Sequence, residues 1–198
     1  FVLSHGELKI PIVLTEPEDG NIRRLVYDIR KMVKSNMYMS AFEHNVGVCN
    51  MIGFTELQSF LILQLFKDVN QDAEKLIDEF MAFEYGKAAP VMRKYLAELE
   101  DAAEKNKLRL AWNPTLNAYT YLTAENMMRW YNYFLDMEKV LKDDPERLNN
   151  VNRVRLNLEY VILMRYNVLL KKYPDFPVKP EALAKTVLAR SQKTIDNY

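Results

Sequence analysis

Helical spacing of apolar residues, continuing with few interruptions from Thr55 to Tyr198, most constrains what this chain can fold into. Apolar residues that recur every three or four positions form one hydrophobic stripe along a helix, and each stripe must be buried against another element. A succession of such helices packs as a bundle. Residues 54–198 are therefore predicted to form an α-helical bundle, and the fold class is predicted to be mainly α.

Cap signals set the first two helices of this bundle. Thr55 and Gln58 have the spacing of a capping box, and the helix that they begin, 55–66, is apolar on nearly all sides. We expect it to be the most buried helix. Asp72 is predicted to begin the next helix, and Gly86 to end it as a left-handed cap.

The next two helices carry a charged face and an apolar core face. Pro90 is predicted in the first turn of a helix with a solvated acidic face, made of Glu98, Glu100, Asp101 and Glu104. After a loop over 106–122, Thr123 caps a helix whose large side chains are expected in the core: Met127, Met128, Trp130, Phe134 and Met137.

Proline marks both ends of the C-terminal helices. Asp144 and Pro145 begin a predicted single long helix that runs to about Lys172, where Pro174 and Pro177 stop it. Pro180 begins the last helix, whose apolar seam is predicted at Ala184, Leu188, Ser191, Ile195 and Tyr198.

Residues 1–53 have a different pattern. Leu8–Leu14 and Met37–Phe42 have the composition of β-strands, and the segment 22–33 between them is an amphipathic helix. Strand, helix and strand in this order predict a short N-terminal βαβ segment with parallel strands. Two strands do not make a stable parallel sheet, so either further strands come from other residues of the chain or the sheet is completed by chain that is absent here. Phe1 in place of an initiator Met fits an excised piece.

Composition excludes several classes of function. Lys plus Arg and Asp plus Glu are equal at 27 each, so no net field attracts nucleic acid or an anionic membrane, and we expect no nucleic-acid partner. The longest apolar run is too short for a membrane span. The single cysteine, Cys49, excludes an internal disulfide and leaves the compartment undetermined.

The sharpest candidates for chemistry follow the second predicted strand. Glu43 lies where a barrel strand ends, the place where such enzymes hold an acid, base or nucleophile. His44 and Asn45 come next and are candidates for substrate binding. Adjacent strand residues face opposite sides, so at most one of Glu43 and His44 points into a site. The alternative is structural, with these side chains hydrogen-bonded to their own loop.

Aromatic residues supply a second candidate. Trp112, Tyr119 and Tyr121 have rings that stack on the C–H face of a sugar, or that anchor the loop to the bundle. His5 and Glu7 have the spacing of a metal-binding pair if that segment is a strand, but with two histidines in the chain we predict neither a metal nor a cofactor.

One region resembles a known family. The run Asp72–Glu100, DAEKLIDEFMAFEYGKAAPVMRKYLAELE, together with FTELQSFLILQLF and AFEHN before it, resembles a bacterial family of domains of unknown function, number 4838. The family is attached to glycoside-hydrolase-like barrels and is common in Bacteroidetes. The resemblance is good from about Asn21 to Glu100 and general thereafter. His44 and Asn45 stand where the family has an acidic residue and a glycine.

This resemblance implies a function. It indicates the C-terminal helical domain of a glycoside-hydrolase-like protein that degrades or binds complex carbohydrate, without catalysis by this chain alone, and a saccharide as ligand. It also implies that the βαβ segment is the last part of a β/α barrel whose other strands lie on absent chain. It also implies a bacterial periplasmic or secreted location. The residues themselves leave an alternative open, a non-enzymatic helical scaffold or protein-interaction module.

Overall fold

The computed structural model describes residues 22–35, 53–106 and 116–196, and these form helices with no strand among them. The α-helices and short 3₁₀ helices follow in order: α1 (Ile22–Lys34), α2 (Thr55–Lys67), α3 (Ala73–Tyr85), η1 (Gly86–Ala88), α4 (Ala89–Asn106), η2 (Leu116–Ala118), α5 (Ala124–Val140), α6 (Pro145–Met164), α7 (Tyr166–Lys172) and α8 (Pro180–Asp196). The mainly α prediction is confirmed. Both predicted strands lie outside the described residues, so the βαβ segment, its barrel and the division at residue 53 stay predictions.

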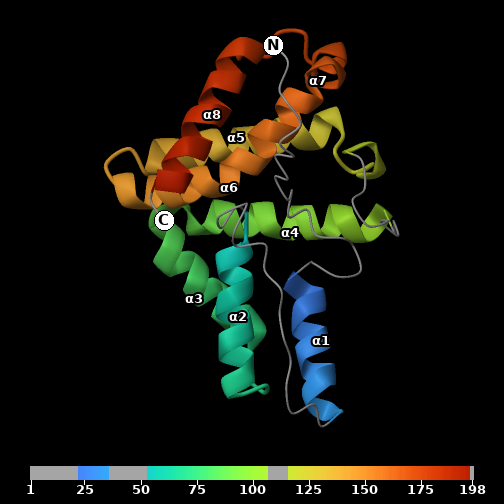
Figure 1. The fold of residues 1–198 in the computed structure, drawn as a ribbon, viewed down its shortest axis with the longest axis vertical. Coiled ribbons are helices and arrows are strands. Elements are labelled where there is room, and N and C mark those ends of the chain that lie inside the picture. The colour runs from blue at the N-terminus through green and yellow to red at the C-terminus, as the bar shows by residue number, and fades with distance from the viewer. Residues whose placement is uncertain (1–21, 36–52, 107–115, 197–198) are drawn as a thin grey trace.

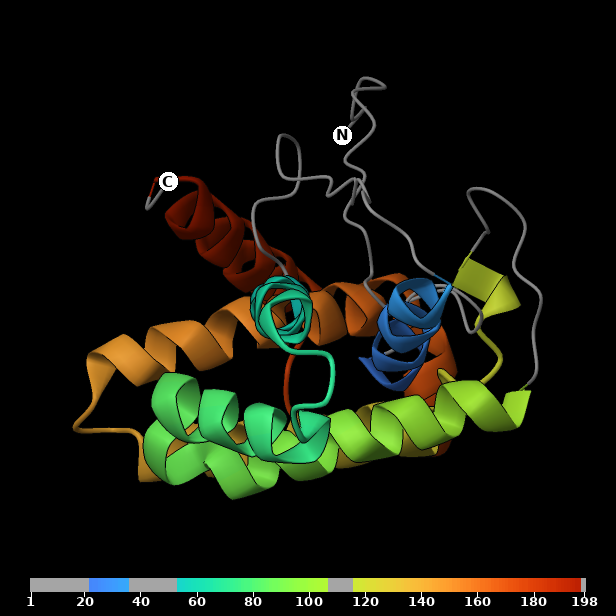
Figure 2. The ribbon, with the colours of Figure 1, turned by 90° about the horizontal axis from the view of Figure 1, so that it is seen from below.

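Helix α4 runs across the middle of the molecule (Figure 1). Helices α5 and α6 lie on one side of it, and α8 crosses α6 beyond them. Helices α1 and α2 stand on the other side at a steep angle to α4, so that a view from below looks along both of them (Figure 2). The two helices run in the same direction and end on the same side of the molecule, away from α4 (Figure 1).

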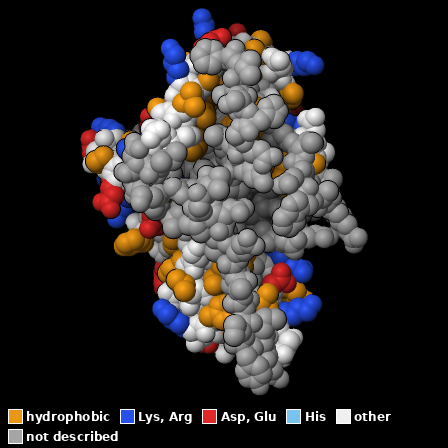
Figure 3. Space-filling model, in the orientation of Figure 1, with side chains coloured by type: hydrophobic (Ala, Val, Ile, Leu, Met, Phe, Trp, Pro, Cys, Tyr) orange, Lys and Arg blue, Asp and Glu red, His pale blue; other side chains and the backbone are white. Residues whose placement is uncertain are grey.

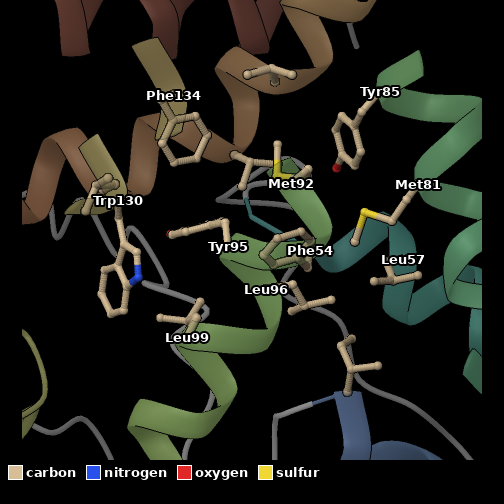
Figure 4. Close-up of a cluster of buried hydrophobic side chains, with 14 of the residues drawn as sticks. Phe54, Leu57, Met81, Tyr85, Met92, Tyr95, Leu96, Leu99, Trp130 and Phe134 are labelled. Carbon is tan, nitrogen blue, oxygen red and sulfur yellow. The ribbon is translucent and has the colours of Figure 1, made fainter. Parts of the chain in front are cut away.

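The main core lies where α2, α3, α4 and α5 meet (Figure 4). Trp130 and Phe134 of α5 are fully buried, and both pack edge to face on Tyr95 of α4, with ring centroids 5.8 Å and 5.0 Å apart. Edge-to-face pairs add stability beyond the area that they bury. Met127 and Met137 are also fully buried and Met128 is half-buried, which confirms the predicted core face of α5.

Side-chain caps begin three helices as predicted. Asp72 accepts hydrogen bonds from the backbone N–H groups of Glu74 and Lys75, and Thr123 accepts one from that of Asn126. Asp144 caps α6 in the same way. Helix α3 ends at Gly86 as predicted, with φ +48°, which L side chains rarely adopt. Its ψ of −118° lies outside the left-handed helical region, so the cap is not the predicted left-handed one.

Two expectations for α2 are wrong. Thr55 is already the first helical residue, so Phe54 occupies the N-cap position. Phe54 makes no side-chain cap bond, because its side chain has no hydrogen-bond acceptor. The helix is also not the most buried one. Leu57, Leu61 and Leu65 face the core, but Leu63 is 63% and Phe66 46% exposed, since no described element covers that side.

The predicted single helix over 145–172 is broken. Helix α6 ends at Met164, Arg165 separates it from α7, and α7 packs on α5. The guanidinium of Arg165 donates to the carbonyl of Leu122 at 2.7 Å, a tertiary bond made at the break. In α8 the seam is also shifted, because Leu183 and Val187 are buried while Leu188 is 67% exposed.

Candidate functional site

The predicted strand-end site lies outside the part of the chain that the structure describes. Glu43, His44, Asn45 and Trp112 all fall in this category, as do His5 and Glu7. The catalytic role of Glu43 and the binding roles of the others therefore stay predictions.

The two described aromatic candidates are buried together. The rings of Tyr119 and Tyr121 meet at right angles with centroids 6.1 Å apart, and both side chains lie inside the protein. Burial raises the pKa of the Tyr121 phenol, which keeps it protonated. The carbonyl of Tyr121 accepts a hydrogen bond from the side-chain amide of Asn126 at 2.8 Å. This burial favours the anchoring alternative over stacking on a sugar.

Two carboxylates share one arginine where α2, α3 and α6 meet. Nη2 of Arg153 lies 3.0 Å from Oε2 of Glu56 and 4.0 Å from Oε2 of Glu84. The amide of Asn150, one turn before Arg153 on α6, donates to the carboxylate of Glu84 at 2.9 Å and to its carbonyl at 3.1 Å. The side chains of Arg153 and Glu84 are 16% and 19% exposed, so the group is mostly shielded from water. We call these four residues the Arg153 cluster.

Burial and neighbouring charges act on the carboxyl group of Glu84 in the Arg153 cluster. Burial, reinforced by the nearby charge of Glu56, raises the pKa of Glu84, while Arg153 acts in the opposite direction. Arg153 of α6 is hydrogen-bonded to Glu56 of α2, and Asn150 of α6 is hydrogen-bonded to Glu84 of α3, so the cluster joins three helices. The arrangement serves first as a structural tie.

Sequence reasoning missed the Arg153 cluster because its members are far apart in the chain. Asn150 and Arg153 have an i, i+3 spacing that puts them on one face of α6. Nothing local indicates that this face meets the start of α2 and the end of α3, so only the tertiary structure identifies the site.

The predicted solvated face of α4 is wrong for two of its four acidic residues. Glu98 is hydrogen-bonded to three side chains of α5: Tyr133 Oη at 2.8 Å, Arg129 Nε at 2.8 Å and Trp130 Nε1 at 3.3 Å. Burial raises the pKa of Glu98, but these hydrogen bonds outweigh it and lower the pKa. Glu98 is thus an ionised clamp between α4 and α5.

Glu100, two residues later, binds the start of α1 and is only 5% exposed. Its Oε1 accepts the backbone N–H of Arg23 at 3.2 Å, and its Oε2 lies 3.4 Å from the guanidinium of the same residue. A carboxylate at a helix N-terminus satisfies free N–H groups and opposes the positive end of the dipole. Burial nevertheless raises the pKa of Glu100, with the bonds from Arg23 acting in the opposite direction.

A chain of alternating charges joins α8 to the bundle. Glu159 of α6 is 1% exposed and pairs with Arg190 of α8 and with Arg155, whose Nε lies 2.8 Å from Oε1. Arg155 also contacts Glu138 at 3.0 Å and lies over the ring of Tyr131. A buried pair of this kind is weak evidence for stability but fixes how the elements fit together.

Neither a metal centre nor a membrane span is found among the described residues. No group of three or more His, Cys, Asp or Glu side chains in ranges 22–35, 53–106 and 116–196 is placed to hold a metal ion. Within the same ranges, no helix has both the length and the apolar character to cross a bilayer.

Comparison with known protein families matches part of the chain to a family of unassigned function. Residues 17–97 match the family model described as "Domain of unknown function (DUF4838)". This match spans α1, α2, α3 and the first half of α4, and it includes the segment that carries Glu43. No curated protein and no solved structure matches the chain.

Proposed function

We propose that this chain is the helical domain of a glycoside-hydrolase-like protein that degrades or binds complex carbohydrate, and that its described helices act as a scaffold without catalysis of their own. The observation that supports the scaffold role is that the shielded acidic side chains bond to neighbouring helices. Glu84, Glu98, Glu100 and Glu159 each bond to another helix. A carboxylate held in this way positions helices and is not available as a general acid or nucleophile.

The carbohydrate part of the proposal rests on the family match and on Glu43. The matched residues run from before α1 into α4, so one family model includes residues 36–52 together with the helices on both sides of them. The tie between Glu100 and Arg23 fixes α1, which precedes that segment, and Glu56 of the Arg153 cluster fixes α2, which follows it. Both helices that flank the segment with the predicted catalytic residue are thus tied to the rest of the bundle.

A saccharide-panel thermal shift tests this function. A ligand that binds only the folded state raises the melting temperature. We expect a shift with at least one oligosaccharide, lost in Glu43→Gln and kept in Glu79→Gln, a control on α3 whose side chain is 57% exposed. No shift with any saccharide would contradict the carbohydrate role. Hydrolysis of glycosides by the purified chain would contradict the scaffold role.

A non-enzymatic interaction module is the second candidate. It is favoured by the large apolar side chains that reach the surface of α1 and α2. Such exposed groups, when they lie together, mark places where partners bind.

A further inference from the structure

Helix α8 lies on the outside of the bundle and packs on α6. In the space-filling view, hydrophobic and basic side chains reach the surface in the upper part of the molecule, where α7 and α8 lie (Figure 3). Between residues 180 and 193, the buried side chains are those of Leu183 and Val187, whereas Leu188 is 67% exposed. Little apolar area therefore holds α8 to the bundle.

The contacts of Val187 are separate from the main core. Val187 packs with Leu156, which is fully buried, and with the half-buried Tyr160, both on α6, and the three side chains form a small apolar cluster of their own. The side chains that join α2, α3, α4 and α5 belong to the larger cluster. Loss of the Val187 contacts would therefore leave the packing of those helices intact.

A buried ion pair fastens the far part of α8. Arg190 pairs with Glu159 of α6, whose side chain is shielded from water. Removing one partner of a buried pair leaves an uncompensated charge, and this opposes separation. Here the opposition is reduced, because Nε of Arg155, also on α6, lies 2.8 Å from the other carboxylate oxygen of Glu159 and stays there when α8 leaves. The guanidinium of Arg190 would pass into water.

The linker before α8 has anchors of its own. Phe176 is buried, and its ring packs on the rings of Tyr131 of α5 and Tyr166 of α7, with centroids 5.2 Å and 6.2 Å apart. The hydroxyl of Tyr166 donates to the carbonyl of Val178 at 2.9 Å. These contacts do not involve α8, so they persist if α8 separates from α6 and keep the start of the helix in place.

We propose that α8 is a strap that separates from α6 as one unit while the rest of the bundle stays folded, with the pair between Arg190 and Glu159 as its latch. Separation uncovers Leu156, Tyr160 and Glu159, an apolar face beside a carboxylate that the closed strap covers. Most of the stability of a helix in a protein comes from its packing, so a detached α8 loses its helical hydrogen bonds. Its backbone N–H groups then exchange hydrogen with solvent, and this exchange measures the opening.

Hydrogen exchange of the whole chain, followed by NMR at single backbone N–H groups, tests the proposal. Residues 184–193 are expected to show protection factors that are similar to one another, because they open together. These protection factors should be about tenfold or more below those around Phe134 of α5 and Leu158 of α6, whose exchange requires the bundle itself to open.

Arg190→Gln removes the latch. It is expected to lower the protection of residues 184–193 about tenfold or more, the effect of one hydrogen bond to a charged group. Lys185→Gln is the matched control, because it also replaces a cation on α8 with Gln, but at an exposed position, and should change nothing. Arg, Lys and Gln have similar helix propensities, so a difference between the two variants reports the ion pair. Unchanged protection around Phe134 shows that each variant stays folded.

Protection of residues 184–193 equal to that of α5 and α6 would overturn the proposal, because α8 would then open only with the whole bundle. Protection that falls steadily toward the C-terminal end of α8 would also overturn it, since this is fraying and not the opening of a unit. Equal effects of Arg190→Gln and Lys185→Gln would contradict the latch. The proposal is independent of the carbohydrate role, because its assay involves neither Glu43 nor a saccharide.

Discussion

Replacing Glu98 with Gln should loosen the junction of α4 and α5. Gln keeps one acceptor oxygen but puts an amide N–H₂ among three donors, those of Arg129, Trp130 and Tyr133. Trp130 is fully buried, and a buried donor left without its acceptor costs about 1–3 kcal/mol. Arg129 is 46% exposed, so its share is discounted for solvent. We expect a loss of about 2 kcal/mol in the free energy of unfolding.

Thermal melting is the first assay for this change. A loss of about 2 kcal/mol corresponds to a fall of about 4–8 °C in a chain of this length. Glu79→Gln is the control, because Glu79 only approaches Lys75, at 3.9 Å, on the surface of α3. A Glu98→Gln variant that melts with the parent and with Glu79→Gln would refute the assignment of Glu98 as a clamp.

The pH dependence of the free energy of unfolding is an independent test of the role of Glu98. The hydrogen bonds hold its pKa in the folded protein below the ordinary value of 4.5. Its contribution is therefore present above pH 4.5 and is lost as the pH falls through the lowered folded pKa. The stability gap between the parent and Glu98→Gln should shrink in acid. A double-mutant cycle with Tyr133→Phe isolates the bond between the two side chains, and additive effects would contradict the contact.

Two further predictions concern Glu100 and Gly86. Burial raises the pKa of Glu100, so its contribution to stability is fully present below the unfolded pKa and is lost as the pH rises through the folded pKa. Glu100→Gln should therefore gain stability relative to the parent as the pH rises from the ordinary pKa of 4.5 toward the raised folded pKa. Chemical denaturation across that range measures this, and the opposite slope would mean that the pair with Arg23 dominates. Gly86→Ala should lower the free energy of unfolding by about 1–2 kcal/mol, because φ is +48° and a Cβ there would lie 2.5 Å from Cδ of Arg147. Gly86→Ala combined with Arg147→Ala should recover only part of this loss, and full recovery would show that the backbone is not strained.

The sequence predicted those features of the fold that depend on contacts between residues close together in the chain. Asp72, Thr123 and Asp144 cap helices because their side chains reach N–H groups two or three residues ahead, and such contacts are visible in the sequence. Helical spacing likewise identified the core face of α5. The break at Arg165 was not predictable, since the guanidinium bonds to Leu122 in a distant loop.

Hydrophobicity alone also could not assign the faces of α2. Its sequence is apolar on nearly all sides, and nothing in the pattern shows that Leu57 meets the core while Leu63 meets solvent. The Arg153 cluster was also not predictable from the sequence, for the same reason. Glu84, Asn150 and Arg153 are ordinary surface residues in the sequence, and only the packing of α3 on α6 brings them together.

The acidic residues of α4 show how one helix joins the two parts of this molecule. Glu98 and Glu100 are two positions apart, so their side chains leave the helix ~200° apart and face opposite sides. One bonds to α5 and the other to α1, and both lie just beyond the residues 17–97 that match the family model. The matched part and the helices after it are therefore connected through a short length of α4 as well as through the core. Loss of Glu98 should weaken the junction of α4 with α5, and loss of Glu100 should alter the junction of α4 with α1, while the buried apolar side chains keep both helices packed on the bundle.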